Sequence, residues 1–494
     1  MRNAARGGVL RKLATTVSLF ALLLDGVDGW WARRHGLSSA FGARFDMETD
    51  ALLILVLALL AWHLGKAGAW VILSGALRYL FVAAGWLLPF LDRPLPPSDR
   101  RRVICVIQIA VLVACFAPIL APVLTTPLAA VVAEAMDPFL RTAYGNPSSL
   151  HWAGVPAHDA VEEARSHVAA LLCCDATEVV FTSGGTEANN LALRSLFTLP
   201  TAGSGRPSLI VSRIEHPSVL RTAEALEREH VHVSWLDPGE DGRVDPAAVE
   251  RALTSGSAGA RLVSLQAVNH ETGVLQPLAE VKEICGRFGA FLHTDAVQAI
   301  GRLSESTFRG ADLTSLASHK VRGPKGIGAL ATACGIKIAP LLRGGEQERG
   351  VRPGTQDPVA AAGFRAALER TDGPARYAAV APLRDKLEHE ILELEPKATV
   401  NGSRAQRAPH VLNISIPGWL GPELAAALDL EGVAVSSGSA CSAGTADPSP
   451  VIAAMAGIAR AKSALRISLG ESTTELEIAE AIAALHRVFA RGAR

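Results

Sequence analysis

The sequence has no excess of either charge. Its 494 residues include 48 Lys and Arg and 48 Asp and Glu, so the formal net charge is zero. Proteins that bind nucleic acid through its phosphates need a basic surplus, and this balance therefore predicts no nucleic-acid partner. The seven cysteines are scattered, and none of them forms a C-x-x-C pair of the metal-binding type. We interpret them as free thiols in a reducing cytoplasm, with Cys173, Cys174, Cys285 and Cys334 as packing residues.

The N-terminus lacks a cleavage site although it begins like a secretory signal. A basic start precedes an apolar run over residues 13–24, but charged residues follow at once from Asp25. Mean hydropathy is +0.25, high for a soluble enzyme, and the excess lies in the first quarter. Further apolar segments at 51–62, 69–91 and 103–124 predict an all-α transmembrane domain over residues 1–124.

The basic segments in this quarter leave the topology open. The N-terminus and a loop with Arg93 and Arg100 to Arg102 should both face the cytoplasm by the positive-inside rule. An enzyme domain in the cytoplasm then requires either an irregular final crossing or a last segment that is not a simple span. We predict a multi-pass membrane protein whose remaining residues form a domain in the cytoplasm.

Four aspartates stand out in the membrane quarter. Asp25 and Asp28 are three residues apart, and Asp46 and Asp50 are four apart, so each pair shares one helix face. Carboxylates at membrane level are costly and usually functional. Four of them suit a hard cation such as Mg²⁺ or Mn²⁺. The alternative is a loop of solvated acidic residues at the membrane interface.

This spacing resembles the signature of the CDP-alcohol phosphatidyltransferases, D-x2-D-G-x2-A-R-x8-G-x3-D-x3-D, at every fixed position. The resemblance implies that Asp25, Asp28 and Asp46 bind the metal, while Asp50, close to it, acts as the base on an acceptor alcohol. It also implies a membrane lipid as substrate. Members of that family usually have six spanning helices. Here the first and last of these are missing, so the domain is incomplete.

After residue 124 the sequence changes character, without a Ser/Gly-rich linker. Short apolar runs alternate with helical patterns, which predicts a mostly parallel sheet between helices. Strands are expected at 179–182, 209–212, 231–236, 261–266 and 291–294, and helices at 157–172, 187–196, 219–229, 278–288, 358–370 and 379–394. In the first helix Glu162, Glu163 and Arg165 are assigned to the solvent side. Ligands of such sheets bind at the carboxyl ends of the strands. We predict domains over 125–370 and 371–494, the second a smaller α+β domain.

Three features point to a pyridoxal phosphate (PLP) site. Lys320 ends an apolar, strand-like run and precedes a Gly/Pro-rich loop, a place where a desolvated amine can attack an aldehyde. Asp295 follows another strand and can hold a pyridinium nitrogen, with Gln298 within reach of the ring hydroxyl. The run from Gly184 to Thr186 between a strand and a helix predicts a phosphate cradle. Taken alone, Lys320 is more often a surface charge.

Residues 125–494 resemble the cysteine desulfurase family, whose motifs occur here in family order. These are Gly184-Gly-Thr-Glu187, Glu215-His216, Asn269-His-Glu-Thr-Gly273, Asp295-Ala-Val-Gln298, His319-Lys320, Gln347-Glu-Arg349 with Arg352-Pro-Gly-Thr355, Ser436-Ser-Gly-Ser-Ala-Cys441 and Leu465-Arg-Ile-Ser-Leu-Gly470. The resemblance implies an α/β fold of PLP fold-type I. It implies an enzyme that converts L-cysteine to L-alanine and passes the sulfur, as an enzyme persulfide, to an acceptor such as an iron–sulfur scaffold or a thiolation protein.

The resemblance also assigns residue roles. Lys320 is the catalytic lysine, Cys441 the sulfur-accepting nucleophile, His216 the histidine over the PLP ring and Arg466 the arginine for the substrate carboxylate. Further cofactor contacts are implied for Gly185, Thr186, Asn269, Asp295, Gln298, Ser318 and His319. Thr355 would reach the phosphate of a second subunit, which implies a homodimer. The chain departs from the family at Ala317, at Glu346 and in a missing first strand.

Two other functions remain open from the sequence. The chain is alternatively a phospholipid-synthesising CDP-alcohol phosphatidyltransferase whose soluble part has lost its activity. It is also conceivable as a non-catalytic scaffold that the membrane part tethers.

Overall fold

A computed structural model describes residues 127–494, with gaps at 200–204, 257–258, 334, 370–372, 439–447 and 493–494, and five isolated positions before residue 80. The chain divides into two units, residues 1–130 and 131–494. In the part of the chain that the structure describes, no helix is both long and apolar enough to cross a bilayer. The four N-terminal aspartates and Cys441 lie outside the described residues.

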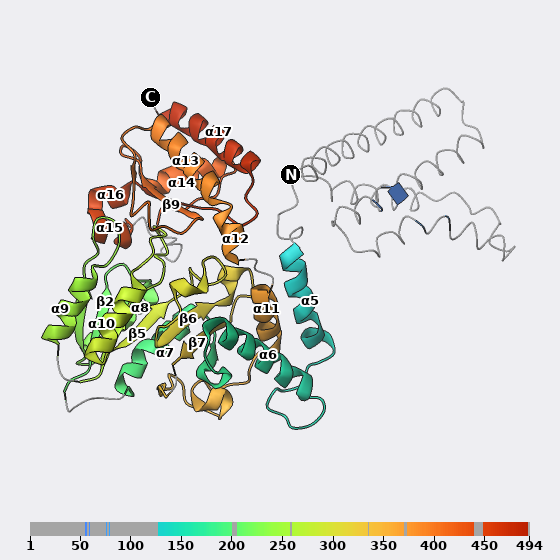
Figure 1. The fold of residues 1–494 in the computed structure, drawn as a ribbon. Coiled ribbons are helices and arrows are strands. Elements are labelled where there is room, and N and C mark those ends of the chain that lie inside the picture. The colour runs from blue at the N-terminus through green and yellow to red at the C-terminus, as the bar shows by residue number, and fades with distance from the viewer. Residues whose placement is uncertain are drawn as a thin grey trace. The chain divides into compact units, whose positions relative to one another are not determined.

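The second unit contains a seven-stranded sheet with the strand order β1-β7-β6-β5-β4-β2-β3 (Figure 1). The strands are β1 Val179–Thr182, β2 Ser208–Ser212, β3 His232–Leu236, β4 Arg261–Ser264, β5 Phe291–Asp295, β6 Leu313–Ala317 and β7 Gly328–Thr332. The neighbours in the run β3-β2-β4-β5-β6 pair in parallel, and β7 runs antiparallel to both β1 and β6. The prediction of a mostly parallel sheet is confirmed.

Helices accompany the sheet as the alternation predicts. They are α5 Pro127–Arg141, α6 Val155–Leu172, α7 Gly185–Arg194, α8 Pro217–Arg228, α9 Pro246–Ser255, α10 Leu278–Phe288 and α11 Pro358–Glu369. Their starts follow capping rules: the Asp245 side chain accepts a hydrogen bond from the Ala247 amide, 3.0 Å away, and Pro246 occupies the first helical turn. Helix α7 packs against β5, β6 and β7, which fixes its N-terminus at the sheet edge.

The chain then forms a smaller layer of helices and antiparallel strands. It contains α12 Gly373–Ala378, α13 Ala381–Leu394, β8 Thr399–Val400, β9 Val411–Ser415, α14 Gly421–Leu430, α15 Pro450–Ala456, α16 Ile458–Lys462, β10 Ala464–Ser468 and α17 Glu475–Gly492. The strands form an antiparallel sheet in the order β10-β9-β8. Its buried face, with Ile414 and Leu465, packs against α13, α14 and α17 through Leu387, Leu424 and Phe489. This core fixes β10 against the helices of the smaller layer.

Two sequence assignments are wrong. Arg165 is buried, with 1% of its surface exposed, because both of its terminal nitrogens donate to Glu348 at 2.7 Å. Glu348 also accepts the Phe181 amide at 2.9 Å, so this ion pair ties α6 to β1 and to the 3-10 turn Gln347–Gly350. Cys173 is exposed at the C-cap of α6, in the left-handed conformation, whereas Cys285 is buried as expected.

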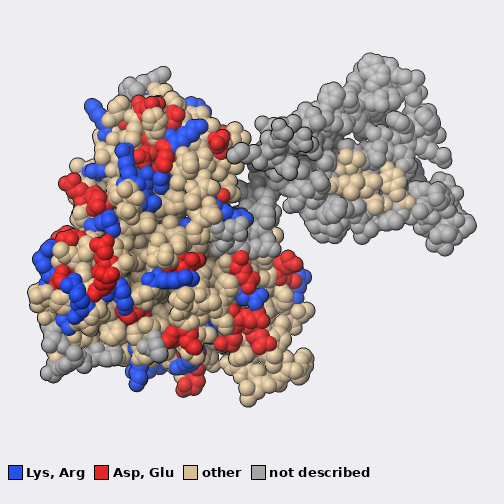
Figure 2. All heavy atoms as spheres, in the orientation of Figure 1, with Lys and Arg blue, Asp and Glu red and all other residues tan. Residues whose placement is uncertain are grey.

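Charges are mixed on the visible surface. On the face shown in Figure 2, basic and acidic side chains of the second unit are interspersed. This distribution agrees with the zero net charge of the sequence.

A buried histidine in the sheet makes stability depend on pH. Burial lowers the pKa of His293, on β5, to about 3, whereas an unfolded histidine has a pKa of about 6.5. The unfolded state therefore binds more protons below that pH, and the free energy of unfolding falls as pH decreases. We expect His293→Asn to remove a slope of about 1.4 kcal/mol per pH unit between about pH 6 and pH 4.

Denaturant unfolding at several pH values measures this slope. The exposed His158, on α6, provides the matched control, and His158→Gln should leave the slope unchanged. An unchanged slope in His293→Asn would contradict the assignment.

Candidate active site

A cavity of about 520 Å³ opens at the carboxyl ends of the parallel strands. Its walls come from the segments that follow β1, β2, β4, β5 and β6, and from β10 of the smaller sheet. This is the location that the sequence predicted for a ligand. Eight of the candidate residues line it: Gly185, Thr186, His216, Asp295, Gln298, His319, Lys320 and Arg466.

One end of the cavity is formed by backbone at the start of α7. Gly184 is the N-cap residue, with φ of 149°, and no side chain caps the helix. A Cβ atom on Gly328 would lie 2.7 Å from the Gly184 Cα, and one on Gly185 would lie 2.8 Å from the Val297 side chain. Only glycine therefore fits where β7 meets this turn. The first N–H groups of α7, with Thr186 beside them, form a cradle suited to an anion.

A carboxylate lies in the cavity wall at the end of β5. The Asp295 Oδ2 atom accepts a hydrogen bond from Asn189 Nδ2 at 2.7 Å, and Oδ1 accepts one from the Val297 amide at 3.0 Å. Asn189 Nδ2 also lies 2.9 Å from the Ser218 hydroxyl. Asp295 is 8% exposed. Its orientation is therefore fixed from two sides, as a partner for a protonated ring nitrogen requires.

Two histidines form another wall and are held neutral. His216 caps α8, and its Nδ1 atom lies 2.7 Å from the Ser218 hydroxyl. Burial lowers its pKa, the positive charge of Lys320 lowers it further, and Asp295 opposes both. The ring of His270 stands edge-on to that of His216 with 5.3 Å between centroids. Burial lowers the pKa of His270 to about 3. Both imidazoles are therefore uncharged near neutral pH.

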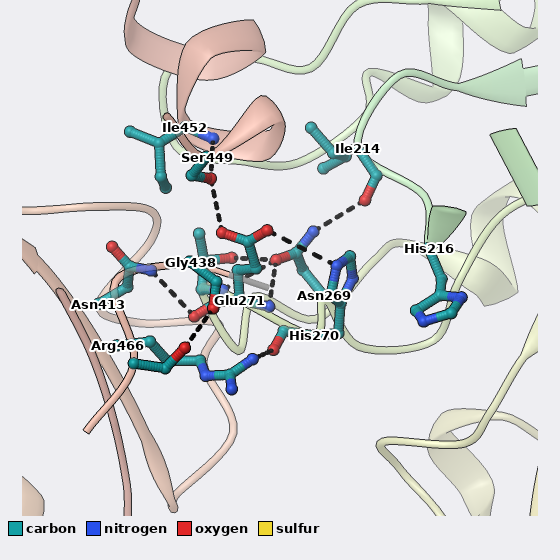
Figure 3. Close-up of polar contacts among 12 residues, drawn as sticks. Ile214, His216, Asn269, His270, Glu271, Asn413, Gly438, Ser449, Ile452 and Arg466 are labelled. Carbon is teal, nitrogen blue, oxygen red and sulfur yellow. Dashed lines mark hydrogen bonds and ion pairs between the residues drawn. The ribbon is translucent and has the colours of Figure 1, made fainter. Parts of the chain in front are cut away.

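Lys320 and Arg466 are two of the cationic side chains of the cavity, besides Lys325. Lys320 lies in the 3-10 turn Ser318–Val321 directly after β6, and its carbonyl accepts a hydrogen bond from Arg302 at 2.8 Å. Arg466 lies on β10, and its Nη1 atom donates to the His270 carbonyl at 3.0 Å (Figure 3). The two residues come from different sheets. A small carboxylate-bearing ligand could bind between them.

Three of the candidate residues lie elsewhere. Asn269 does not line the cavity, because its amide donates to the Ile214 carbonyl at 3.0 Å and accepts from the Glu271 and Thr272 amides. Ser318 is fully buried and is not among the lining residues. Thr355 is exposed and borders a separate cavity of about 200 Å³.

The cavity also contains side chains that the sequence did not single out: Asn189, Gln266, His270 and Lys325. Asn189 was detectable, since it follows Gly185 by one helical turn and so shares its face. His270 belongs to a recognised motif, but only the packing of β10 places it at the cavity. The Gln266 amide nitrogen donates to the Ile214 carbonyl at 2.5 Å, which fixes the segment that carries His216.

The fold and this cavity define a class of enzyme. Residues 124–480 match the family model described as aminotransferase class-V, whose members are PLP-dependent enzymes. Residues 7–135 match the model of the CDP-alcohol phosphatidyltransferases. The two matched ranges overlap around the start of α5.

Curated relatives narrow the class. The chain is 37% identical over 369 residues to cysteine desulfurase IscS of Dictyoglomus turgidum, covering 74% of this chain and 92% of the relative. It is 42% identical over 359 residues to a cysteine desulfurase of Cereibacter sphaeroides, covering 72% and 91%. A solved NifS-like protein matches with a TM-score of 0.64 and 30% identity, covering 73% of this chain and 95% of that one. The chain therefore belongs to the cysteine desulfurase family.

A single substitution tests whether Asn189 orients the Asp295 carboxylate for PLP binding. Asn189→Leu removes the hydrogen bond to Asp295 in a buried site, and we expect about a tenfold loss of PLP affinity. Equilibrium dialysis of PLP against purified protein measures this. The neighbouring Asn190 bonds instead to the Thr186 carbonyl and the Thr222 hydroxyl, so Asn190→Leu serves as the matched control. Equal affinities in the two variants would contradict the role of Asn189.

Proposed function

We propose that this chain is a PLP-dependent cysteine desulfurase that converts L-cysteine to L-alanine and retains the sulfur as a persulfide on Cys441. The observation that carries the proposal is the combination, in one cavity, of Lys320, Asp295 and Arg466. The family relationship supports the same reaction.

The residues of the cavity fit PLP. The glycine-lined start of α7, with Thr186 and His319, suits the phosphate, because added Cβ atoms at Gly185 and Gly328 would collide with their neighbours. Asp295 suits the ring nitrogen, Gln298 the ring hydroxyl, His216 a ring face and Lys320 the aldehyde. When bound, PLP withdraws electrons from the substrate Cα and makes its proton acidic.

The remaining steps belong to the side chains of the chain itself. Arg466 binds the substrate carboxylate through its guanidinium. The Lys320 amine takes the Cα proton and later returns one, and neutral His216 can assist this transfer. The Cys441 thiolate attacks the substrate sulfur, so that an S–S bond forms as the Cβ–S bond breaks. The substrate Cβ then accepts a proton, and the product leaves as L-alanine. A sulfur-acceptor protein then takes the persulfide sulfur.

We further propose a homodimer in which Thr355 approaches the phosphate site of the second subunit. The exposure of Thr355 supports this. In a separate segment, the loop after α5, Tyr144, Leu150 and Trp152 expose between 87% and 101% of their surface, which is unusual for large apolar side chains of a monomer. For Asn269 and Ser318, which do not line the cavity, we propose an indirect effect on PLP binding through the loops behind the cofactor.

Sulfide release tests the main proposal. Purified protein with L-cysteine and a thiol reductant should release sulfide, and Lys320→Ala and Cys441→Ala should each lower the rate by at least about a hundredfold. Cys285→Ala is the matched control, because burial raises the pKa of the Cys285 thiol to about 12 and keeps it unreactive. PLP binding without any sulfide release in the unaltered protein would overturn the proposal.

The match over residues 7–135 favours a second activity. We propose that residues 1–124 form a multi-pass membrane domain, followed by a PLP-binding domain (125–370) and a C-terminal domain (371–494) in the cytoplasm. Asp25, Asp28 and Asp46 would bind Mg²⁺ or Mn²⁺, and Asp50 near the metal would activate the alcohol of a lipid precursor. The intact aspartate spacing supports this proposal.

Release of CMP from a CDP-linked lipid tests the second activity. In membranes that contain the full chain, release should require Mg²⁺ or Mn²⁺ and fall at least about a hundredfold in Asp50→Asn. Lys320→Ala should leave it unchanged, since that residue belongs to the other site. Metal-independent release, or none at all, would contradict the proposal.

A further inference from the structure

Glu271 is a fully buried carboxylate beside the cavity but not in its lining. One oxygen, Oε2, accepts a hydrogen bond from the Ser449 hydroxyl at 2.5 Å. The other, Oε1, lies 3.8 Å from His270 Nε2 and has no hydrogen-bond partner among the described residues. A buried carboxylate is costly unless its bonds compensate for lost hydration. Glu271 therefore needs a role that justifies this placement.

Bonds from three separate segments converge on Glu271 (Figure 3). Its amide donates to the Asn269 side chain at 2.9 Å, within the loop after β4. Its carbonyl accepts from Asn413 Nδ2, on β9, at 3.1 Å. Ser449 is itself the N-cap of α15, where its hydroxyl oxygen accepts the Ile452 amide at 3.0 Å. Glu271 thus joins the loop of the larger sheet to both a strand and a helix of the smaller layer.

The same connections lead to Arg466. Its guanidinium donates to the carbonyl of His270, the residue immediately before Glu271. Its backbone pairs with Asn413 across β9 and β10. Burial raises the pKa of Glu271, and the hydrogen bond from Ser449 and the positive charge of Arg466 partly oppose this rise. Arg466 is therefore linked to Glu271 both through the His270 carbonyl and through the strand pair.

We propose that Glu271 is a positioning residue for Arg466: its bond to Ser449 fixes the His270 carbonyl that directs the Arg466 guanidinium into the cavity. The proposal rests on the proposed function only in that Arg466 receives a substrate carboxylate. It requires that loss of the Glu271–Ser449 bond weakens ligands with a carboxylate and spares amines without one.

Ligand binding to the full-length holoprotein shows whether loss of the Glu271–Ser449 bond weakens only the ligands that have a carboxylate. Calorimetric titration with L-alanine reports binding through amine and carboxylate, and ethylamine reports binding through the amine alone. In Ser449→Ala and Glu271→Leu, which each remove the Ser449–Glu271 hydrogen bond, we expect the L-alanine dissociation constant to rise about tenfold, with that of ethylamine within about twofold. KM for L-cysteine should rise by a similar factor, with kcat changed less than about threefold.

Control variants exclude a general loss of structure. Ser415, on β9, is equally buried and donates to the Arg460 carbonyl at 2.9 Å, away from Glu271. Ser415→Ala should leave both dissociation constants unchanged, and Ser449→Thr, which keeps the hydroxyl, should restore L-alanine binding to within about threefold of the unaltered protein. If Ser449→Ala or Glu271→Leu unfolds, Ser449→Thr compared with Ser449→Cys, whose thiol is a weaker donor, gives the same comparison.

Two results would overturn the proposal. Equal weakening of L-alanine and ethylamine would mean that the Glu271–Ser449 bond only maintains the fold, and unchanged L-alanine binding would mean that it does not act on Arg466. Failure of the proposed function is distinct, because it would appear as absent sulfide release in the unaltered protein while L-alanine binding remained measurable.

Discussion

The close approach of β7 to the turn after β1 is the constraint on which the cavity depends. A Cβ on Gly328 would lie 2.7 Å from the Gly184 Cα, so glycine at position 328 lets the turn lie directly against the strand. This contact sets the start of α7, and α7 in turn carries Asn189 to the Asp295 carboxylate. The same backbone contact therefore positions both the anion cradle at the start of α7 and the Asp295 carboxylate.

Burial controls the electrostatics of the site. The imidazoles of His216 and His270 are kept neutral because desolvation disfavours their charged forms, and nearby cations add to this effect. The positive groups of the cavity are therefore Lys320, Lys325 and Arg466, without an additional imidazolium from these two histidines. Arg466 is contributed by the smaller sheet, so the geometry of the substrate side depends on how the two sheets are joined. Glu271 lies at that junction.

Local patterns predicted much of this arrangement, and tertiary contacts account for the rest. Strand 179–182 and helix 278–288 were bounded correctly because apolar runs and turn residues mark their ends. Lys320 and Asp295 follow strands in the sequence, so their place at the sheet edge could be inferred. The burial of Arg165 could not be inferred from the sequence, because its partner Glu348 is 183 residues away. The antiparallel β7 and the inward position of His270 likewise depend on long-range packing.

The pairing of β1 with β7 has a consequence for synthesis of the chain. Val179 pairs with Ala331, and the Arg165–Glu348 ion pair closes over the same junction from still further along the sequence. During translation β1 emerges long before either partner, so its edge and the start of α7 remain incomplete until about residue 350 has left the ribosome. Contacts of such sequence separation form slowly. In the growing chain the cofactor cradle is therefore completed late, and the edge of β1 that pairs with β7 stays unpaired until then.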